Sequence, residues 1–342
     1  MVRWLRRMVR RWGVRAVGIV VTGIGLYVVA PSLVTLFGAW PSLEAVRPWW
    51  FVVLAVLQLA SFASLWLLYR IGMPHARWRD LAASQLVGNA ISKVLPGGAA
   101  TGGVLQGRML VVAGRPAGEV TSALSATGLM TTGVLLAIPV LTVPTLIIGP
   151  PPARQLQLGL LVSVVLAVAV MALGTAVLKW DRFVTWIGRA AGHLVHLVRR
   201  RVSVDAVAST FHAERDQVAA AFTGRWTRSL GAAAASRMLD YAALVAALHA
   251  VGAEIRPARV LLAYVVAMAL GMVPITPGGL GIVEAGLTTW LVLSGVDAQA
   301  AVVATLLYRL ASYWLPIPLG ALAWGGWAMH RRMDLPVPEP PG

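Results

Sequence analysis

The sequence predicts an all-α, polytopic helical membrane protein, and three observations support this prediction. Of the 342 residues, 58% are hydrophobic and 12% are charged, whereas a soluble globular domain carries roughly 25% charged residues. Several apolar runs reach the roughly 20 residues that a helix needs to cross a bilayer. Two further apolar segments are interrupted by proline and glycine. We therefore expect about six full spans and two broken helix pairs.

Full spans are expected wherever a long apolar run is bounded by charged or turn-forming residues. In chain order they are 16–37, 49–71, 120–148, 156–180, 229–251 and 299–327. They belong to a single predicted transmembrane domain, residues 16–328. A basic cytoplasmic segment, 1–15, precedes it, and a disordered cytoplasmic tail, 329–342, follows it.

The two broken pairs contain the same Pro-Gly-Gly interruption. It stands at Pro96-Gly97-Gly98 in the first pair, 80–113, and at Pro277-Gly278-Gly279 in the second pair, 260–294. After the first break the apolar run begins at Val104, and its ten or so residues would reach only about 15 Å, half a bilayer. The pairs are therefore expected to be re-entrant, although full crossing remains an alternative.

Each broken pair is followed by a full span, which indicates an internal repeat at about 74–148 and 257–328. Because an odd number of predicted spans separates the copies, the second copy would enter the membrane from the opposite side. Inverted repeats with broken helices near the midplane are a recurring architecture of secondary transporters. The simpler alternative is that Pro-Gly-Gly only ends two helices.

The charge distribution predicts the orientation. The chain has 29 lysines and arginines and a net charge of +16. With Met1 inside, only Arg47, Arg154, Arg256 and Arg259 fall outside, so the positive-inside rule predicts cytoplasmic termini in the plasma (inner) membrane. Residues 181–228 are arginine-rich with apolar residues at helical spacing, which predicts a cytoplasmic amphipathic segment on anionic lipid headgroups. Because the loops explain the charge, no nucleic-acid partner is expected.

The sequence contains no pattern typical of an enzyme or a metal site. It has no cysteine, and the pair His193-x-x-His196 lacks further zinc ligands. The glycines after Pro96 are not followed by the Lys-Ser or Lys-Thr of a P-loop. We therefore expect no catalytic residues, no metal and no cofactor, and we do not expect an enzyme.

Polar residues inside the predicted membrane segments are the candidates for a substrate site, because charge is costly in hydrocarbon. Arg309 would contact a phosphate, and Glu284 would either cap its helix or receive a cationic headgroup or a proton. Arg237 and Asp240, three apart on one helix, are expected to form a buried ion pair. The candidate headgroup- or substrate-binding residues are Gln85, Asn89, Lys93, Gly97, Gly98, Gly278, Gly279, Glu284, Arg309 and Tyr313.

Three motifs resemble a known family. They are Gln85-x-x-x-Asn89 before Pro96-Gly97-Gly98, then Pro274-x-x-Pro277-Gly278-Gly279-x-Gly281-x-x-Glu284, and Tyr308-Arg309 with Tyr313 and Pro316. Over residues 15–328 the chain resembles the lysylphosphatidylglycerol synthase transmembrane family, the flippase region of the bacterial multiple peptide resistance factor. The resemblance implies handling of phospholipids, which in the best-known members are aminoacylated phosphatidylglycerol. Those members continue into a soluble aminoacyl-transferase domain, whereas this sequence ends at Gly342, so synthesis of an aminoacyl lipid is not implied.

These features lead to one main hypothesis and two alternatives. The main hypothesis is a phospholipid flippase that binds an anionic or zwitterionic headgroup between the two broken helices. The first alternative is a non-transporting accessory subunit for a separate lipid- or glycan-modifying enzyme, and the weaker one is a secondary transporter of small anions. The expected partners are membrane phospholipids, with a homo-oligomer or a separate lipid-modifying enzyme as further candidates.

Overall fold

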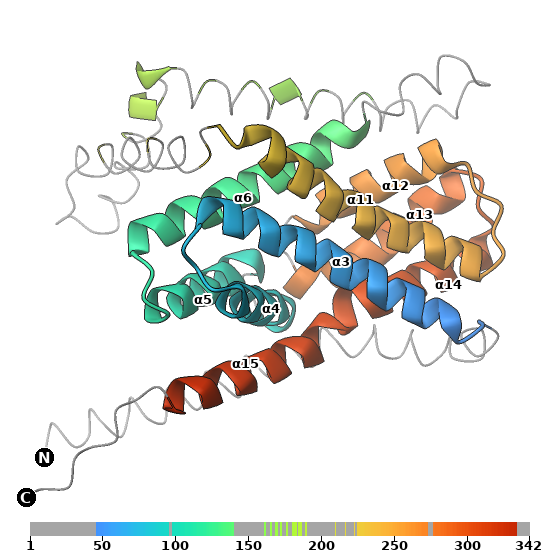
Figure 1. The fold of residues 1–342 in the computed structure, drawn as a ribbon. Coiled ribbons are helices and arrows are strands. Elements are labelled where there is room, and N and C mark those ends of the chain that lie inside the picture. Colours follow the sequence, from blue (N-terminus) through green and yellow to red (C-terminus); the bar gives the residue numbers. More distant parts are fainter. Residues whose placement is uncertain are drawn as a thin grey trace, which may run out of the picture.

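The computed structural model describes residues 46–95, 98–139, 224–272 and 276–333, together with isolated positions between 161 and 222. Over these residues the chain is helical and contains no strand (Figure 1). The predicted spans 16–37 and 156–180, most of the surface segment 181–228 and both predicted terminal segments fall largely outside them. The helices are α3 (Trp49–Gly72), α4 (Trp78–Val94), α5 (Gly98–Val112), α6 (Ala117–Ala137), α11 (Trp226–Ala250), α12 (Pro257–Gly271), η2 (Pro277–Gly279), α13 (Ile282–Leu293), α14 (Ala298–Arg309), η3 (Leu310–Trp314) and α15 (Pro316–Met333).

Three helices are long and apolar enough to cross a membrane. They are α3, α6 and the continuous helix Ala298–His330, which joins α14, η3 and α15. They correspond to three of the spans expected from the sequence. On α3, Val52 is 63% exposed, and on α15, Leu322 is 73% exposed. Apolar side chains exposed along such helices are suited to contact with lipid, so the chain is an integral membrane protein.

Helices α3 and α11 run antiparallel along one another (Figure 1). The Arg225 guanidinium donates to the carbonyl of Ile71 at one end. In the middle, the Ser61 hydroxyl donates to the carbonyl of Ser236 at 2.9 Å. At the other end, where α11 stops, Ala250 and Val46 line the same pocket. The α3–α11 pair therefore provides an axis against which the other helices can be placed.

The two broken helix pairs start from opposite ends of this axis (Figure 1). Helix α4 begins shortly after α3 ends, and it packs closely against α5 and α15. Helix α12 begins shortly after α11 ends, and it packs against α13. Because α3 and α11 are antiparallel, the chain enters the first pair at one end of the bundle and the second pair at the other.

The helix after the first break is longer than predicted. The apolar run was expected to begin at Val104, but α5 begins at Gly98, so Gly102 and Gly103 lie within a helix. The reason is packing, because Gly102 lies directly against the backbone of Gly88 on α4. A close backbone contact of this kind compensates for the low helix propensity of glycine.

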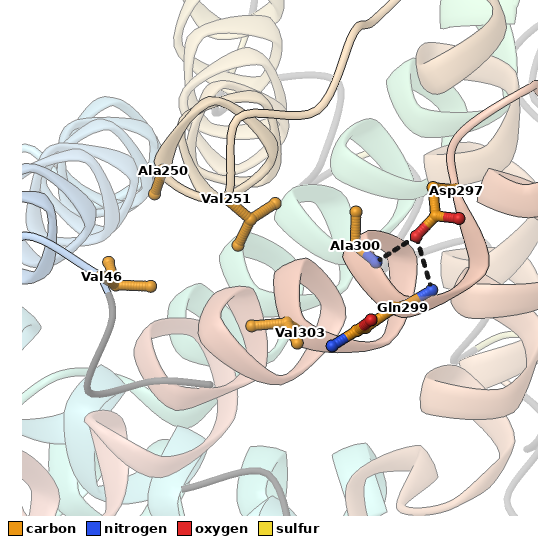
Figure 2. A pocket seen from close by; sticks show the side chains of 7 residues that line it. All are labelled: Val46, Ala250, Val251, Asp297, Gln299, Ala300 and Val303. Carbon is orange, nitrogen blue, oxygen red and sulfur yellow. Dashed lines mark hydrogen bonds between the residues drawn. The ribbon is translucent and has the colours of Figure 1, made fainter. Parts of the chain in front are cut away.

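Where α11 ends and α14 begins, a pocket of about 410 Å³ opens at the surface (Figure 2). Its one acidic group, Asp297, accepts hydrogen bonds from the backbone N–H groups of Gln299 and Ala300, at 3.0 and 3.1 Å. Asp297 is thus the N-cap of α14, and its carboxylate stabilises the helix end. The remaining lining is mainly apolar, so this pocket is distinct from the charged site described next.

Candidate functional site

The centre of the candidate site is an ion pair between Glu284 on α13 and Arg309 at the end of α14. The Arg309 Nε donates to the Glu284 Oε1 at 2.7 Å, and their side chains are 8% and 20% exposed respectively. The other carboxylate oxygen of Glu284 accepts from the backbone N–H of Gly281 at 2.6 Å. Glu284 therefore caps its helix and pairs with the arginine at once, so one of the two roles weighed for it, capping, is confirmed.

Arg309 also connects the ion pair to the second break. Its Nη2 donates to the carbonyl of Gly278 at 3.4 Å, and its guanidinium lies 4.5 Å from the centre of the Tyr313 ring. Gly278 has a φ of +57°, and a Cβ there would lie 2.7 Å from a ring carbon of Tyr313. Only glycine fits this position, because both the backbone conformation and the space exclude a side chain.

Lys93, at the end of α4, joins the same cluster from the first broken pair. Its Nζ donates to the carbonyl of Ser312, and the Tyr313 hydroxyl donates to the Lys93 carbonyl at 2.6 Å. Pro316 explains why the Ser312 carbonyl is available, because a proline has no N–H to offer the residue four positions earlier. The chain widens here into η3, a π-helical turn at Leu310–Trp314, and such turns often occur at functional sites.

A second polar cluster surrounds Asp240 on α11, which is 9% exposed. One of its carboxylate oxygens accepts two hydrogen bonds, from the hydroxyls of Tyr264 on α12 at 2.7 Å and of Tyr308 on α14 at 2.9 Å. Tyr308 directly precedes Arg309 in the chain. This cluster therefore ties three helices together next to the ion pair.

The ion pair predicted between Arg237 and Asp240 is not formed. The Arg237 Nε donates to the carbonyl of Thr131 on α6 at 3.2 Å, while Asp240 is held by the two tyrosines. The two side chains are one helical turn apart, but they point toward different neighbouring helices. Among the described residues Glu284 and Arg309 form the ion pair that the structure does contain inside the bundle.

The structure brings together five of the ten predicted binding residues: Lys93, Gly278, Glu284, Arg309 and Tyr313. The others lie elsewhere or are not described. Gln85 accepts from the indole of Trp66 at 2.9 Å, and the backbone carbonyl of Asn89 accepts from Ser92. Gly279 packs against Gly271, Gly98 starts α5, and Gly97 lies outside the described residues.

Sequence reasoning did not single out Tyr264 and Tyr308 as site residues. A signal for Tyr264 was present, because between Arg259 and Gly271 it is the only residue with an oxygen or nitrogen atom in its side chain. Tyr308 directly precedes Arg309 in the third motif that resembles the family. Neither observation indicated that both hydroxyls would meet Asp240, since the three residues are far apart in sequence.

The arrangement is suited to binding a group that carries opposite charges. Arg309 can bind an anionic oxygen through several N–H groups, and Glu284 can receive a cation. In the structure these two charges satisfy one another, which keeps both stable in an apolar setting. Within the described helices, no three His, Asp or Glu residues lie together as metal ligands would.

The sequence is similar to one family of membrane proteins. A family model described as the lysylphosphatidylglycerol synthase TM region matches residues 15–320. A UPF0104 membrane protein of Pyrococcus horikoshii is 37% identical over 71 residues, and this match covers 21% of each chain. The family match spans nearly all of the predicted transmembrane domain, including both broken helix pairs. The chain therefore belongs to the family of the lysylphosphatidylglycerol synthase transmembrane region.

Proposed function

We propose that this protein is a translocator that carries phospholipid headgroups across the plasma membrane without changing them chemically. The observation that supports it most strongly is the Glu284–Arg309 ion pair next to the second break. A headgroup phosphate would replace Glu284 as the partner of Arg309, and an ammonium on the headgroup would occupy the freed carboxylate. Because each charge exchanges one partner for another, the exchange avoids leaving a charge unpaired inside the membrane.

The proposal also assigns roles to the two broken pairs. We take α4–α5 with α6, and α12–α13 with the continuous helix of α14, η3 and α15, as inverted repeats whose broken helices are re-entrant. Lys93 from the first repeat contacts Ser312 and Tyr313 of the second, so movement between the repeats would change the surroundings of Arg309. Rocking of one repeat against the other would then expose the site to each leaflet in turn. With six full spans, both termini would lie in the cytoplasm.

A flipping assay on the purified protein in liposomes tests this function. Fluorescent analogues of phosphatidylglycerol and of an amino-headgroup lipid are bleached by a membrane-impermeant reagent. The rate at which the lipid of the inner leaflet becomes accessible to the reagent is measured. We expect the wild-type protein to accelerate flipping and the double variant Arg309→Gln, Glu284→Gln to lose the acceleration. The double variant suits the test because it removes both charges together and leaves neither unpaired. Glutamine at position 284 can still cap α13.

Arg108→Gln is the matched control, because Arg108 is an exposed arginine outside the cluster. It is expected to flip lipid at the wild-type rate. Flipping that persists in a folded double variant would show that the headgroup does not bind at this ion pair. No acceleration by the wild-type protein with either lipid would contradict the translocator itself and favour an accessory role.

A further inference from the structure

A cavity separate from the ion pair lies at the loop between α3 and α4 and the loop between α5 and α6. It has a volume of about 290 Å³, and its lining comes from two loops and the helix ends beside them. The lining residues are His75, Ala76, Arg77, Arg79, Asp80, Leu110, Ala113 and Arg115. None of these residues belongs to the cluster around Arg309.

The charge of this cavity is strongly positive. Three arginines and a histidine face one carboxylate, Asp80. Arg79 contacts His330 on α15, but Arg77 and Arg115 make no ion pair with any carboxylate in the described part of the chain. Two guanidinium groups from different loops therefore line one cavity, and neither forms an ion pair with a carboxylate among the described residues. Two such groups can together bind the oxygens of one anionic group.

The surroundings place the cavity at the level of the membrane surface. Trp78, the first residue of α4, is 50% exposed, and the Arg70 guanidinium lies 5.8 Å from the centre of its ring. Tryptophans and arginines of this kind are typical of the membrane–water interface. The volume is at the lower end of the roughly 300–1,000 Å³ typical of small-molecule sites, enough for a headgroup but not for acyl chains.

We propose that this cavity is a second binding site. It binds a phosphate group together with a hydroxyl or ammonium group of the same ligand. Arg77 and Arg115 bind the phosphate oxygens from opposite loops, and Asp80 accepts a hydrogen bond from the neighbouring donor. The ligand is either the headgroup of a phospholipid in the adjacent leaflet or a free phosphate compound, since both carry this chemistry. The site does not depend on translocation by the Arg309 cluster.

Isothermal titration calorimetry tests the proposal on the detergent-purified full chain carrying Arg309→Gln and Glu284→Gln, which lacks the first proposed headgroup site. The probes are short-chain phosphatidylglycerol, inorganic phosphate and a short-chain diacylglycerol without phosphate. We expect phosphatidylglycerol to bind and diacylglycerol not to bind. The double variant Arg77→Gln, Arg115→Gln should weaken phosphatidylglycerol binding by at least about tenfold, since two charge-assisted contacts are lost. Inorganic phosphate that binds with similar affinity would identify a soluble phosphate as the ligand, and binding of the lipid alone would identify a headgroup.

The matched control is Arg108→Gln, Arg228→Gln, which removes the same charge from exposed positions outside the cavity. We expect it to change the affinity by less than about twofold, because exposed charges act weakly at a distance. Equal weakening by both double variants, or none by the first, would overturn the proposal. So would phosphatidylglycerol binding that the unaltered protein shows and the Arg309→Gln, Glu284→Gln background lacks, because the lipid would then bind only at the Arg309 cluster.

A second variant tests the cavity without changing its charge. Ala113 lines the wall at the end of α5, and Ala113→Trp would fill the space while all arginines remain. In the same Arg309→Gln, Glu284→Gln background, we expect this variant to abolish phosphatidylglycerol binding even if the double arginine variant does not fold. Undiminished binding by folded Ala113→Trp would show that the ligand does not enter this cavity.

Discussion

Asp240 is a carboxylate held inside the helix bundle by two hydroxyl groups. Both Tyr264 and Tyr308 donate to the same oxygen, at 2.7 and 2.9 Å. Hydrogen bonds to a charged acceptor are stronger than those to a neutral one, and leaving a buried charge without donors is costly. The contribution of each tyrosine hydroxyl should therefore be larger here than at a neutral acceptor.

Each of these two hydroxyls is expected to contribute to stability. We expect Tyr308→Phe and Tyr264→Phe each to destabilise the protein by about 1.5–3 kcal/mol, because each removes a donor to a carboxylate. The double variant should lose more than the sum of the two, since it leaves the carboxylate without either donor. Chemical unfolding in detergent, followed by circular dichroism, measures these losses.

Tyr241→Phe provides the matched control. Its hydroxyl donates to the neutral carbonyl of Pro257 at 2.7 Å, so we expect a smaller loss of about 0.5–1.5 kcal/mol. Equal losses for Tyr241→Phe and Tyr308→Phe would mean that the charge on Asp240 does not strengthen its hydrogen bonds.

At the same scale, the sequence predicted which residues matter better than it predicted their partners. Glu284 and Arg309 were recognised as charges inside membrane segments, but they were assigned to separate parts of a ligand. Their contact depends on how α13 and α14 pack, which no local pattern reveals. Arg237 and Asp240 show the reverse error, because helical spacing suggested a pair that the neighbouring helices α6, α12 and α14 prevent.

At the scale of elements, the hairpin of α4 and α5 is built on close backbone contact. A Cβ at Gly102 would lie on the carbonyl oxygen of Gly88 and 2.9 Å from the Cβ of Ser92. On the other side of α4, a Cβ at Gly320 of α15 would lie 2.7 Å from the carbonyl oxygen of Leu86. Helix α4 is therefore packed between two helices at nearly the closest distance that backbones allow.

Two adjacent glycines of α5, Gly102 and Gly103, should respond differently to substitution by alanine. We expect Gly102→Ala to destabilise the protein by about 1–3 kcal/mol, because the added methyl group forces α4 and α5 apart. A Cβ at Gly103 meets nothing within 4 Å, so Gly103→Ala should leave stability unchanged or raise it by up to about 1 kcal/mol. Thermal unfolding of both variants in the same detergent measures the difference. A stable Gly102→Ala variant would contradict the close packing of this hairpin.

Helix positions were predicted well where composition alone decides them. The span expected at 49–71 corresponds to α3, Trp49–Gly72, and the polar half-helix expected from Asp80 corresponds to α4, Trp78–Val94. The prediction failed at α5, where glycines that a propensity argument assigns to a break are helical for reasons of packing. The π-helical turn at η3 was also missed, although Pro316 marks its end in the sequence.

At the scale of the whole molecule, the two broken pairs begin at opposite ends of the antiparallel α3–α11 pair (Figure 1). The sequence predicted this inversion from an odd number of spans, some of which lie outside the described residues. The described helices lead to the same inversion independently, because α3 and α11 are antiparallel and each is followed directly by one broken pair. If this axis crosses the membrane, the loops that follow the two pairs must face opposite compartments.

Two positions just after the broken pairs test this inverted topology. Ala117 begins α6, Ala298 begins α14, and both are exposed. Because the chain has no cysteine, Ala117→Cys and Ala298→Cys each introduce a single thiol, and the unaltered protein is the control for unspecific labelling. With cytoplasmic termini, a membrane-impermeant maleimide should label Ala298→Cys in intact cells and Ala117→Cys only after permeabilisation. Labelling of Ala117→Cys in intact cells, and of Ala298→Cys only after permeabilisation, would support the inversion with the opposite orientation in the membrane. Labelling of both thiols from the same side would show that the two repeats are not inverted, and alternating access between inverted halves would then be ruled out.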